Sequence, residues 1–155
     1  MIQDERNTLS VLVPDDASEQ AYVKISYFGT NGFGRVGKPD MTDDGVLLVA
    51  SLADLMATKV KVILQRAEAK DYRDIAAMLM AGVSLASGLA AARELFGKNF
   101  QPSESLKALT FFKDGDLPTL SNQEKSVLIN AASTVRDLPS VAILSNRLSC
   151  HQKLS

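Results

Sequence analysis

The sequence contains few of the residues that build proteins stabilised by disulfides or metal ions. Among its 155 residues there are one cysteine, Cys150, one histidine, His151, and no tryptophan. A single cysteine cannot form an internal disulfide, and one cysteine with one histidine cannot complete a structural zinc site. This composition excludes a small disulfide-stabilised secreted fold, and we expect no metal ligands in this chain.

Long apolar runs and an excess of charge of one sign are also missing. No apolar stretch approaches the roughly 20 residues needed to cross a bilayer. The start, Met1 to Arg6, has neither the basic residues nor the apolar core of a signal peptide. The formal net charge of −1 gives no long-range attraction to nucleic acid or to anionic lipid. We therefore expect a cytoplasmic protein without a membrane partner, in which any nucleic-acid contact would need a local patch.

The first third of the chain has the pattern of short strands. Thr8–Val13 and Tyr22–Phe28 are rich in β-branched and aromatic residues that alternate with polar ones, and Pro14-Asp15-Asp16 between them is typical of a turn. A third short apolar run covers residues 46–50. These patterns predict a small antiparallel sheet within residues 1–50.

From residue 51 onward the pattern is helical. Ser84 and Gly97 are placed to begin and end a helix over Leu85–Phe96, and Pro102 is suited to the first turn of a helix over residues 103–112. The sequence Ser121-Asn122-Gln123-Glu124 is a capping box. The chain is long enough for one domain with one core. We therefore predict a single α+β domain over residues 1–148, with the sheet packed on a bundle of about five helices in residues 51–148 and a frayed tail at 149–155.

A glycine-rich segment between the second and third predicted strands matches a nucleotide-binding pattern. Gly32-Phe33-Gly34-Arg35-Val36-Gly37 satisfies G-x-G-x-x-G. That motif binds a dinucleotide only where its glycines open a helix, whose N-terminus holds the pyrophosphate. Here Lys38-Pro39 follows at once, and proline prevents a helix from continuing. We interpret the segment as a loop and predict that it binds no dinucleotide.

The most informative stretch is Ser51–Met80. On a helical wheel at about 100° per residue, Lys59 lies near the centre of an apolar face. That face contains Leu52, Leu55, Met56, Val60, Val62 and Ile63. The opposite face, which we expect to be solvated, contains Asp54, Thr58, Lys61 and Gln65.

A lysine on an apolar face must either extend its ammonium to water or meet an anion. Extension to water, or a salt bridge to a neighbouring helix, is the ordinary structural explanation. Arg66 shares the face with Lys59, and Asp71 and Asp74 are one turn apart on the next predicted helix. Two cations and two carboxylates are therefore expected to meet at one helix–helix corner.

These residues also carry a family resemblance. The segments Asp54-Leu55-Met56-Ala57-Thr58-Lys59, Gln65-Arg66 and Ala69–Ile75 resemble the block D-L-x-A-x-K…R…[KR]-D-x-x-D-[LI] of the AbiEii/AbiGii nucleotidyl transferase toxins. The resemblance implies a bacterial toxin–antitoxin protein of abortive infection. It also implies magnesium and a nucleoside triphosphate as cofactors, a nucleic-acid or protein acceptor, and a cognate antitoxin as partner.

The resemblance assigns roles to individual residues. Lys59 would neutralise the pyrophosphate charge or position the triphosphate, and Asp71 would be a base or would orient Lys59. Arg66, Lys70 and Asp74 would support nucleotide binding. A structural alternative remains open for Asp71 and Asp74, since Asp-x-x-Asp at a helix start also caps the helix.

One part of the family pattern has no counterpart in this sequence. Family members carry a glycine-rich G-[GS]-[TS] segment and an Asp-x-Asp pair that hold the metal and the phosphates, and nothing before Thr8 supplies them. Asp15-Asp16 is a poor substitute because it lies in a predicted turn. Ser26 stands on a strand where relatives often have a third carboxylate.

Two hypotheses follow. The first is a nucleotidyl transferase-like protein that is incomplete or catalytically impaired, and that has a missing N-terminal segment or an antitoxin as partner. The alternative is a non-catalytic truncated remnant or interaction module that binds a protein.

Overall fold

The computed structural model describes residues 3–5, 8–14, 22–28 and 32–148. The chain forms two compact units, one with the strands before residue 33 and one covering Phe33–Leu148. Each is described by itself. Strands and helices are both present, so the predicted α+β class is confirmed, whereas the single domain over residues 1–148 stays a prediction.

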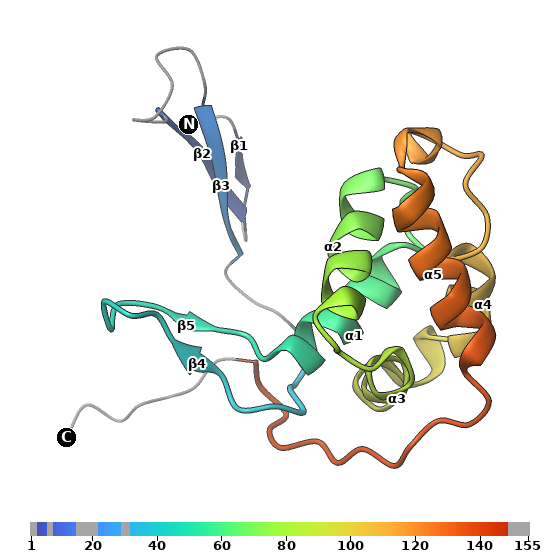
Figure 1. The fold of residues 1–155 in the computed structure, drawn as a ribbon. Helices are drawn as coiled ribbons and strands as arrows, with labels where there is room; N and C mark the ends of the chain where they lie inside the picture. The colour runs from blue at the N-terminus through green and yellow to red at the C-terminus, as the bar shows by residue number, and fades with distance from the viewer. Residues whose placement is uncertain (1–2, 6–7, 15–21, 29–31, 149–155) are drawn as a thin grey trace. The chain divides into compact units, whose positions relative to one another are not determined.

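The first unit is an antiparallel sheet in the order β1-β2-β3. Its strands are β1 (Gln3–Glu5), β2 (Thr8–Pro14) and β3 (Tyr22–Phe28), shown in blue in Figure 1. The β2–β3 register runs from Thr8 opposite Phe28 to Pro14 opposite Tyr22. Both strands were predicted from their alternation. The polar strand β1 carries no such signal and was not predicted.

In the second unit, the third predicted strand does not join this sheet. Instead β5 (Leu48–Val49) pairs with β4 (Asp40–Met41) in a separate antiparallel hairpin. The cause is a local turn. The carbonyl of Thr42 accepts from the Gly45 amide at 2.8 Å, and Gly45 has a φ of 72° that favours glycine. The chain therefore folds back on its nearest neighbour in sequence.

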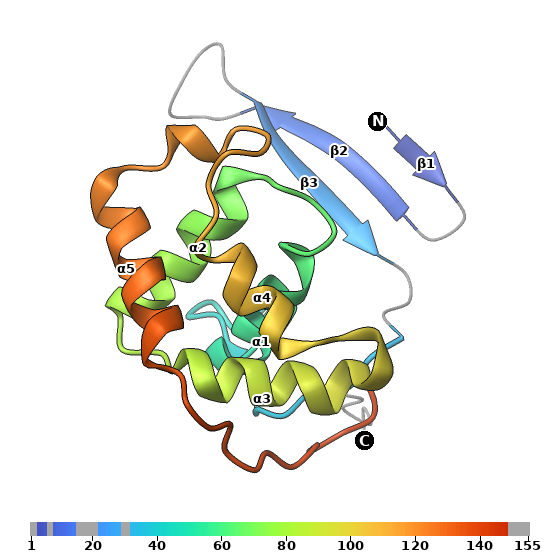
Figure 2. The same cartoon turned by 90° about the vertical axis from the view of Figure 1, so that its right-hand side faces the viewer.

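Five α-helices complete the described part of the chain, close to the predicted number. They are α1 (Leu52–Val62), α2 (Ala69–Met80), α3 (Leu85–Phe96), α4 (Pro102–Ala108) and α5 (Asn122–Thr134), with short 3-10 turns at Gly97–Asn99 and Leu117–Thr119. Helix α1 contacts both α2 and α3, α2 also contacts α5, and α4 contacts α3 and α5. Figure 2 shows α3 from the side, with α1 and α4, which it contacts, drawn above it.

The helix boundaries follow the capping signals of the sequence. The hydroxyls of Ser51 and Ser84 accept hydrogen bonds from backbone amides in the first turns of α1 and α3. Ser121 and Glu124 form the predicted capping box of α5. The helix predicted over residues 103–112 is shorter than expected. It ends at Ala108, and the turn that follows buries Leu109 completely in the core.

The core lies where these helices meet. Met56, Val60, Ile75, Leu89 and Leu128 are fully buried. At the crossing of α1 and α3, a Cβ on Gly88 would collide with the side chain of Met56, so only glycine allows this approach. The Ser105 hydroxyl donates to the Val60 carbonyl at 2.6 Å and ties α4 to α1. Helix α1 is thus held from several sides.

The prediction that the apolar face of α1 is buried is only half correct. Met56, Val60 and Ile63 are buried, but Leu52 is 54% and Leu55 36% exposed. The prediction that Asp54 is solvated is also wrong, since this residue is only 4% exposed. The start of α1 buries a carboxylate instead of a leucine because the carboxylate binds the glycine-rich loop.

The glycine-rich segment is a loop, as predicted, and its amides bind Asp54. The amides of Val36 and Gly37 donate to the two carboxylate oxygens of Asp54 at 2.7 and 3.0 Å, and the Ser51 hydroxyl donates at 2.6 Å. Successive backbone amides of this kind can bind an anion. Here the anion is the chain's own carboxylate, and the next element is β4 and not a helix.

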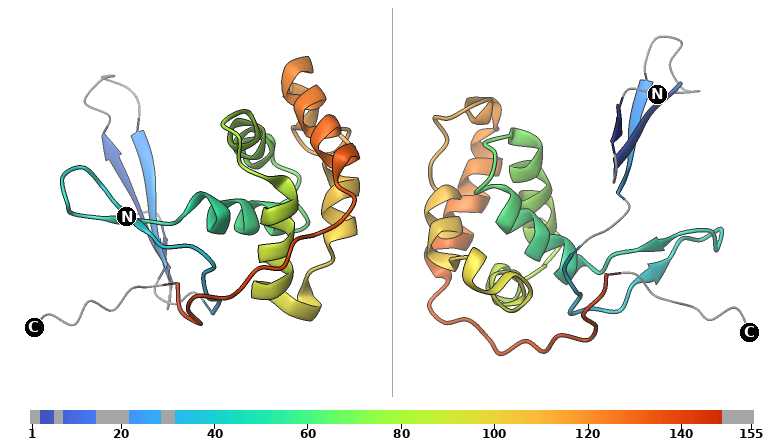
Figure 3. Two further views of the ribbon diagram at one scale, coloured as in Figure 1. Left: turned by 60° about the horizontal axis from the view of Figure 1, so that its bottom comes forward. Right: turned by 180° about the vertical axis from the view of Figure 1, so that it is seen from behind.

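The same loop also binds the end of the chain segment that follows α5. Residues 135–148 contain no helix and return toward the start of α1, as the red trace in Figure 3 shows. The Arg35 amide donates to the Ser145 carbonyl at 2.9 Å. A Cβ on Gly34 would collide with that carbonyl. The glycines therefore permit close approach between backbone segments.

Candidate functional site

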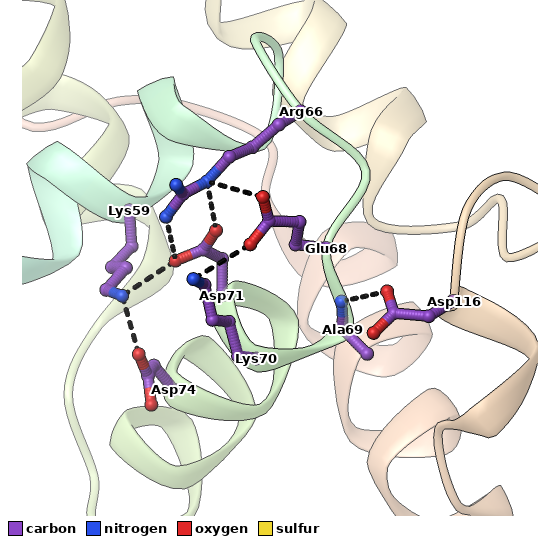
Figure 4. A network of polar contacts seen from close by, with 8 residues as sticks. All are labelled: Lys59, Arg66, Glu68, Ala69, Lys70, Asp71, Asp74 and Asp116. Atoms are coloured by element: carbon purple, nitrogen blue, oxygen red, sulfur yellow. Dashed lines mark hydrogen bonds and ion pairs between the residues drawn. The ribbon is translucent and has the colours of Figure 1, made fainter. Parts of the chain in front are cut away.

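The candidate site is built by the second half of α1, the first turns of α2 and the segment between them. Lys59 comes from α1, Arg66 from the connecting segment, and Asp71 and Asp74 from α2. Figure 4 shows their side chains pointing toward one another. The convergence expected from the sequence is therefore present, and it rests on the sharp turn between α1 and α2.

Asp71 is the centre of the cluster. Its side chain is fully buried, with 0% exposure. One oxygen accepts from the Lys59 ammonium at 2.8 Å, and the other accepts from Arg66 Nε at 2.8 Å. Arg66 Nη2 adds a longer contact of 3.3 Å to the first oxygen. Both oxygens of this carboxylate are thus bound by cations.

Lys59 joins the two carboxylates of α2. Its ammonium lies 2.6 Å from an oxygen of Asp74 in addition to its contact with Asp71. The Lys59 side chain is 20% exposed and that of Asp74 is 52% exposed. The predicted ion pairs are confirmed, and the ammonium lies between a buried carboxylate and a solvated one.

The pKa values in the cluster favour the charged forms. Burial alone would raise the pKa of Asp71, but hydrogen bonds from Arg66 and Lys59 outweigh it and lower that pKa. Burial alone would lower the pKa of Lys59, but its two carboxylates raise it. The hydrogen bond to Asp71 also raises the pKa of Arg66. All of these groups are charged at neutral pH.

The capping alternative for Asp71 is wrong. Its carboxylate oxygens bind the two cations and not the helix amides. The helix N-terminus is capped from elsewhere, because the Asp116 carboxylate accepts from the Ala69 amide at 2.7 Å while Glu68 makes no side-chain cap. Asp116 lies 47 residues away in sequence, so no local pattern could have identified it.

Lys70 stands apart from the other predicted residues. Its ammonium lies 2.9 Å from Glu68, and its side chain is 64% exposed. Glu68 in turn lies 3.7 Å from Arg66 Nε, so Lys70 is linked to the cluster only through another side chain. Glu68 was not predicted. The structure therefore brings four of the five predicted residues into direct contact.

A family model described as Nucleotidyl transferase AbiEii toxin, Type IV TA system, matches residues 5–138. The match covers most of the chain and includes the whole cluster. The chain belongs to the AbiEii nucleotidyl transferase toxin family. No curated protein and no solved structure matched it.

The Lys59 cluster does not fit the magnesium site that AbiEii chemistry implies. Among the described residues, no group of three or more His, Cys, Asp or Glu side chains could hold a metal ion. The cluster itself is unsuitable because cations occupy both oxygens of Asp71, and Asp74 pairs with Lys59. Asp15-Asp16 lies outside the described residues.

Within the part of the chain that the structure describes, no helix combines the length and the hydropathy that a membrane span needs.

Proposed function

We propose that this chain is an AbiEii-type, nucleotidyl transferase-like protein that binds nucleotide phosphates through Lys59 and Arg66. We further propose that this chain by itself is impaired in transfer, because the cluster offers no free carboxylate pair for magnesium. One observation carries the phosphate-binding proposal: the fully buried Asp71 fixes two cations side by side at a partly exposed corner. Such fixed cations are suited to a phosphate, whose charge they neutralise without first having to be ordered.

Without Asp74, the cluster has a net positive charge, which favours phosphate binding. Lys59, Arg66 and Asp71 together carry a charge of +1, and Asp74 is the solvated group that balances it. A phosphate oxygen could replace Asp74 on the Lys59 ammonium while the buried pair stays intact. In this proposal Asp74 and the nucleotide compete for Lys59.

The roles of the individual residues follow. Lys59 would neutralise the charge of the triphosphate or of the leaving pyrophosphate, and Arg66 would support it. Asp71 would position both cations. A carboxylate whose pKa is lowered and whose oxygens are both occupied is a poor general base, so of the two roles weighed for Asp71 we keep the positioning one. Lys70 would add positive charge at the rim.

Transfer itself would need magnesium held by carboxylates that this cluster does not supply. We propose that a further segment or a partner chain, with a cognate antitoxin as one candidate, supplies them. The acceptor would be a nucleic acid or a protein, and the setting would be abortive infection in the cytoplasm of a bacterium.

Calorimetric titration tests the phosphate-binding proposal. Each of the four ribonucleoside triphosphates is titrated with magnesium into the wild type, Lys59→Met and Lys98→Met. Lys98 is an exposed lysine outside the cluster and serves as the control. We expect saturable heat with at least one nucleotide in the wild type and in the control, and a large loss in Lys59→Met. Absence of heat with all four nucleotides, from a folded wild-type sample, would refute the proposal.

A second candidate function is a non-catalytic interaction module. The observation that favours it is the complete internal pairing of the cluster, in which Lys59 and Arg66 are balanced by Asp71 and Asp74. A balanced network can simply stabilise the α1–α2 corner. In that case no nucleotide binds, and Lys59→Met changes stability alone.

A further inference from the structure

A cavity of about 350 Å³ is lined in part by the segment that joins α1 to α2. Its walls come from the end of α1, the start of α2, α4 and the loop that follows α4. Apolar side chains line part of it, among them Ile63, Leu64 and Phe111. The volume falls in the range of small-molecule sites.

Two of the apolar wall residues are not covered by the protein. Leu64 is 40% exposed and Phe111 is 48% exposed. An exposed aromatic ring beside a cavity offers a face on which a ligand, and a cation in particular, can rest. The mouth of the cavity therefore has apolar surface available to a ligand.

Two polar residues, Tyr72 and Asp114, line the cavity, and their side chains make no hydrogen bond or ion pair among the described residues. Tyr72 is only 2% exposed and is fixed by an edge-on ring contact with Phe112 at 6.3 Å, yet its hydroxyl makes no hydrogen bond within that part of the chain. The Asp114 carboxylate likewise has no ion pair or hydrogen bond there. Solvent reaches both groups, since the Tyr72 hydroxyl is not among the fully buried unpartnered atoms and Asp114 is exposed. A ligand that makes hydrogen bonds to them would replace water there.

The charges around the cavity select the sign of the ligand. Glu104 and Lys107 pair with each other at 2.9 Å and cancel, which leaves the charge of Asp114 unbalanced. The charge of Asp114 also acts on Tyr72, since burial first and then this carboxylate raise the pKa of its hydroxyl. An anion such as a nucleotide phosphate would be repelled, whereas a cation would be attracted.

We propose that this cavity binds an organic cation, an ammonium or guanidinium group on an apolar stem. The cation would bind the Asp114 carboxylate and the Tyr72 hydroxyl oxygen, and the stem would lie against Leu64 and Phe111. The ligand is either the side chain of a lysine or arginine in another polypeptide or a free amine. This site is separate from the Lys59 cluster and does not depend on nucleotide binding.

The proposal is tested by NMR titration of the isotope-labelled full chain. The probes are N-acetyl-lysine methylamide, which represents a polypeptide side chain, pentylamine, which represents a free amine, and N-acetyl-norleucine methylamide, a neutral match for the lysine derivative. We expect at least one cation to bind saturably and to shift the amides that line the cavity. The neutral probe should bind at least about ten-fold more weakly, as expected for loss of one charged hydrogen bond.

Matched variants locate the site. Asp114→Asn should weaken binding of the cation by about ten-fold, whereas Asp137→Asn, which removes an exposed carboxylate elsewhere, should not change it. Tyr72→Phe keeps the ring and removes only the hydroxyl, and should also weaken binding. Stronger binding of the lysine derivative would assign the site to a polypeptide, and stronger binding of pentylamine would assign it to a free amine.

Three results would overturn the proposal. They are equal binding of the neutral probe, unchanged binding in a folded Asp114→Asn variant, and absence of binding by both cations at millimolar concentration. Loss of nucleotide binding in the Lys59 variant has no bearing on any of them.

Discussion

The energetic coupling between Lys59 and Asp71 is the sharpest test of the cluster. In the wild type, Asp71 is fully buried and accepts from two cations. Lys59→Met removes one of them and leaves Arg66 in place. The loss of one charge-assisted hydrogen bond should lower the free energy of unfolding by about 1.5–3 kcal/mol. This is below the roughly 3–5 kcal/mol expected when a buried charge loses its only partner.

The same change should cost much less when Asp71 is replaced first. In Asp71→Asn, the remaining charged partner of Lys59 is Asp74, which is 52% exposed. An exposed pair contributes about 0–1 kcal/mol, so Lys59→Met should then be nearly neutral. The difference between the two backgrounds gives a coupling energy of about 0.5–3 kcal/mol, with about 2 kcal/mol as the central expectation.

The measurement is equilibrium unfolding in urea for the wild type, both single variants and the double variant. The control is the same cycle on Glu104 and Lys107, an exposed pair on α4 whose charged atoms lie 2.9 Å apart, close to the 2.8 Å between Lys59 and Asp71. The control coupling should be about 0.2–0.5 kcal/mol. If Lys59 and Asp71 couple no more strongly than this control pair, the buried carboxylate does not hold the lysine and the reasoning fails.

Four further outcomes are expected. Ile63→Ala should lower the free energy of unfolding by about 2–5 kcal/mol, whereas Leu52→Ala should change it by less than about 0.5 kcal/mol. If chemical denaturation gave the same change for both variants, the difference in burial between Ile63 and Leu52 would be contradicted. Although burial alone would raise the pKa of Asp71, its two cations lower it. Its contribution to stability is thus present above the unfolded pKa of about 3.9 and is lost as the pH falls through the folded pKa. Acid titration of stability should therefore show a smaller loss below about pH 4 in Asp71→Asn than in the wild type. Asp116→Ala should cost about 1 kcal/mol through loss of the cap on α2, and an unchanged unfolding midpoint would argue against that cap. The loop at Gly32–Gly37 should show no saturable binding of NAD or NADP at micromolar concentration by fluorescence titration, because Asp54 occupies its amides.

Local sequence patterns were sufficient where the cause of the structure is local. The alternation in β2 and β3, the capping box at Ser121 and the proline at the start of α4 each act within a few residues, and each was predicted from the sequence. The pairing of Lys59 with Asp71 and Asp74 could also be predicted. It needed only the helical spacing within two successive helices and the short segment between them.

The errors have a common origin in contacts between distant segments. Asp54 was placed on the solvated face of α1, since its helical position is opposite the apolar residues. The structure buries it because amides 17 and 18 residues earlier in the chain donate to its carboxylate. Leu52 and Leu55 have the right periodicity to be buried, but the neighbouring helices do not cover that end of the face.

The sequence by itself therefore determined the α+β class, most helix boundaries, the family and the identity of the clustered charges. Tertiary structure alone decided the use of each polar group. In the folded chain Asp116 caps α2, Asp54 binds the amides of the glycine-rich loop, and Tyr72 lies in the wall of a cavity. The physical reason is that periodicity specifies which face a side chain occupies, whereas its partner depends on which distant segment the packed core brings against that face.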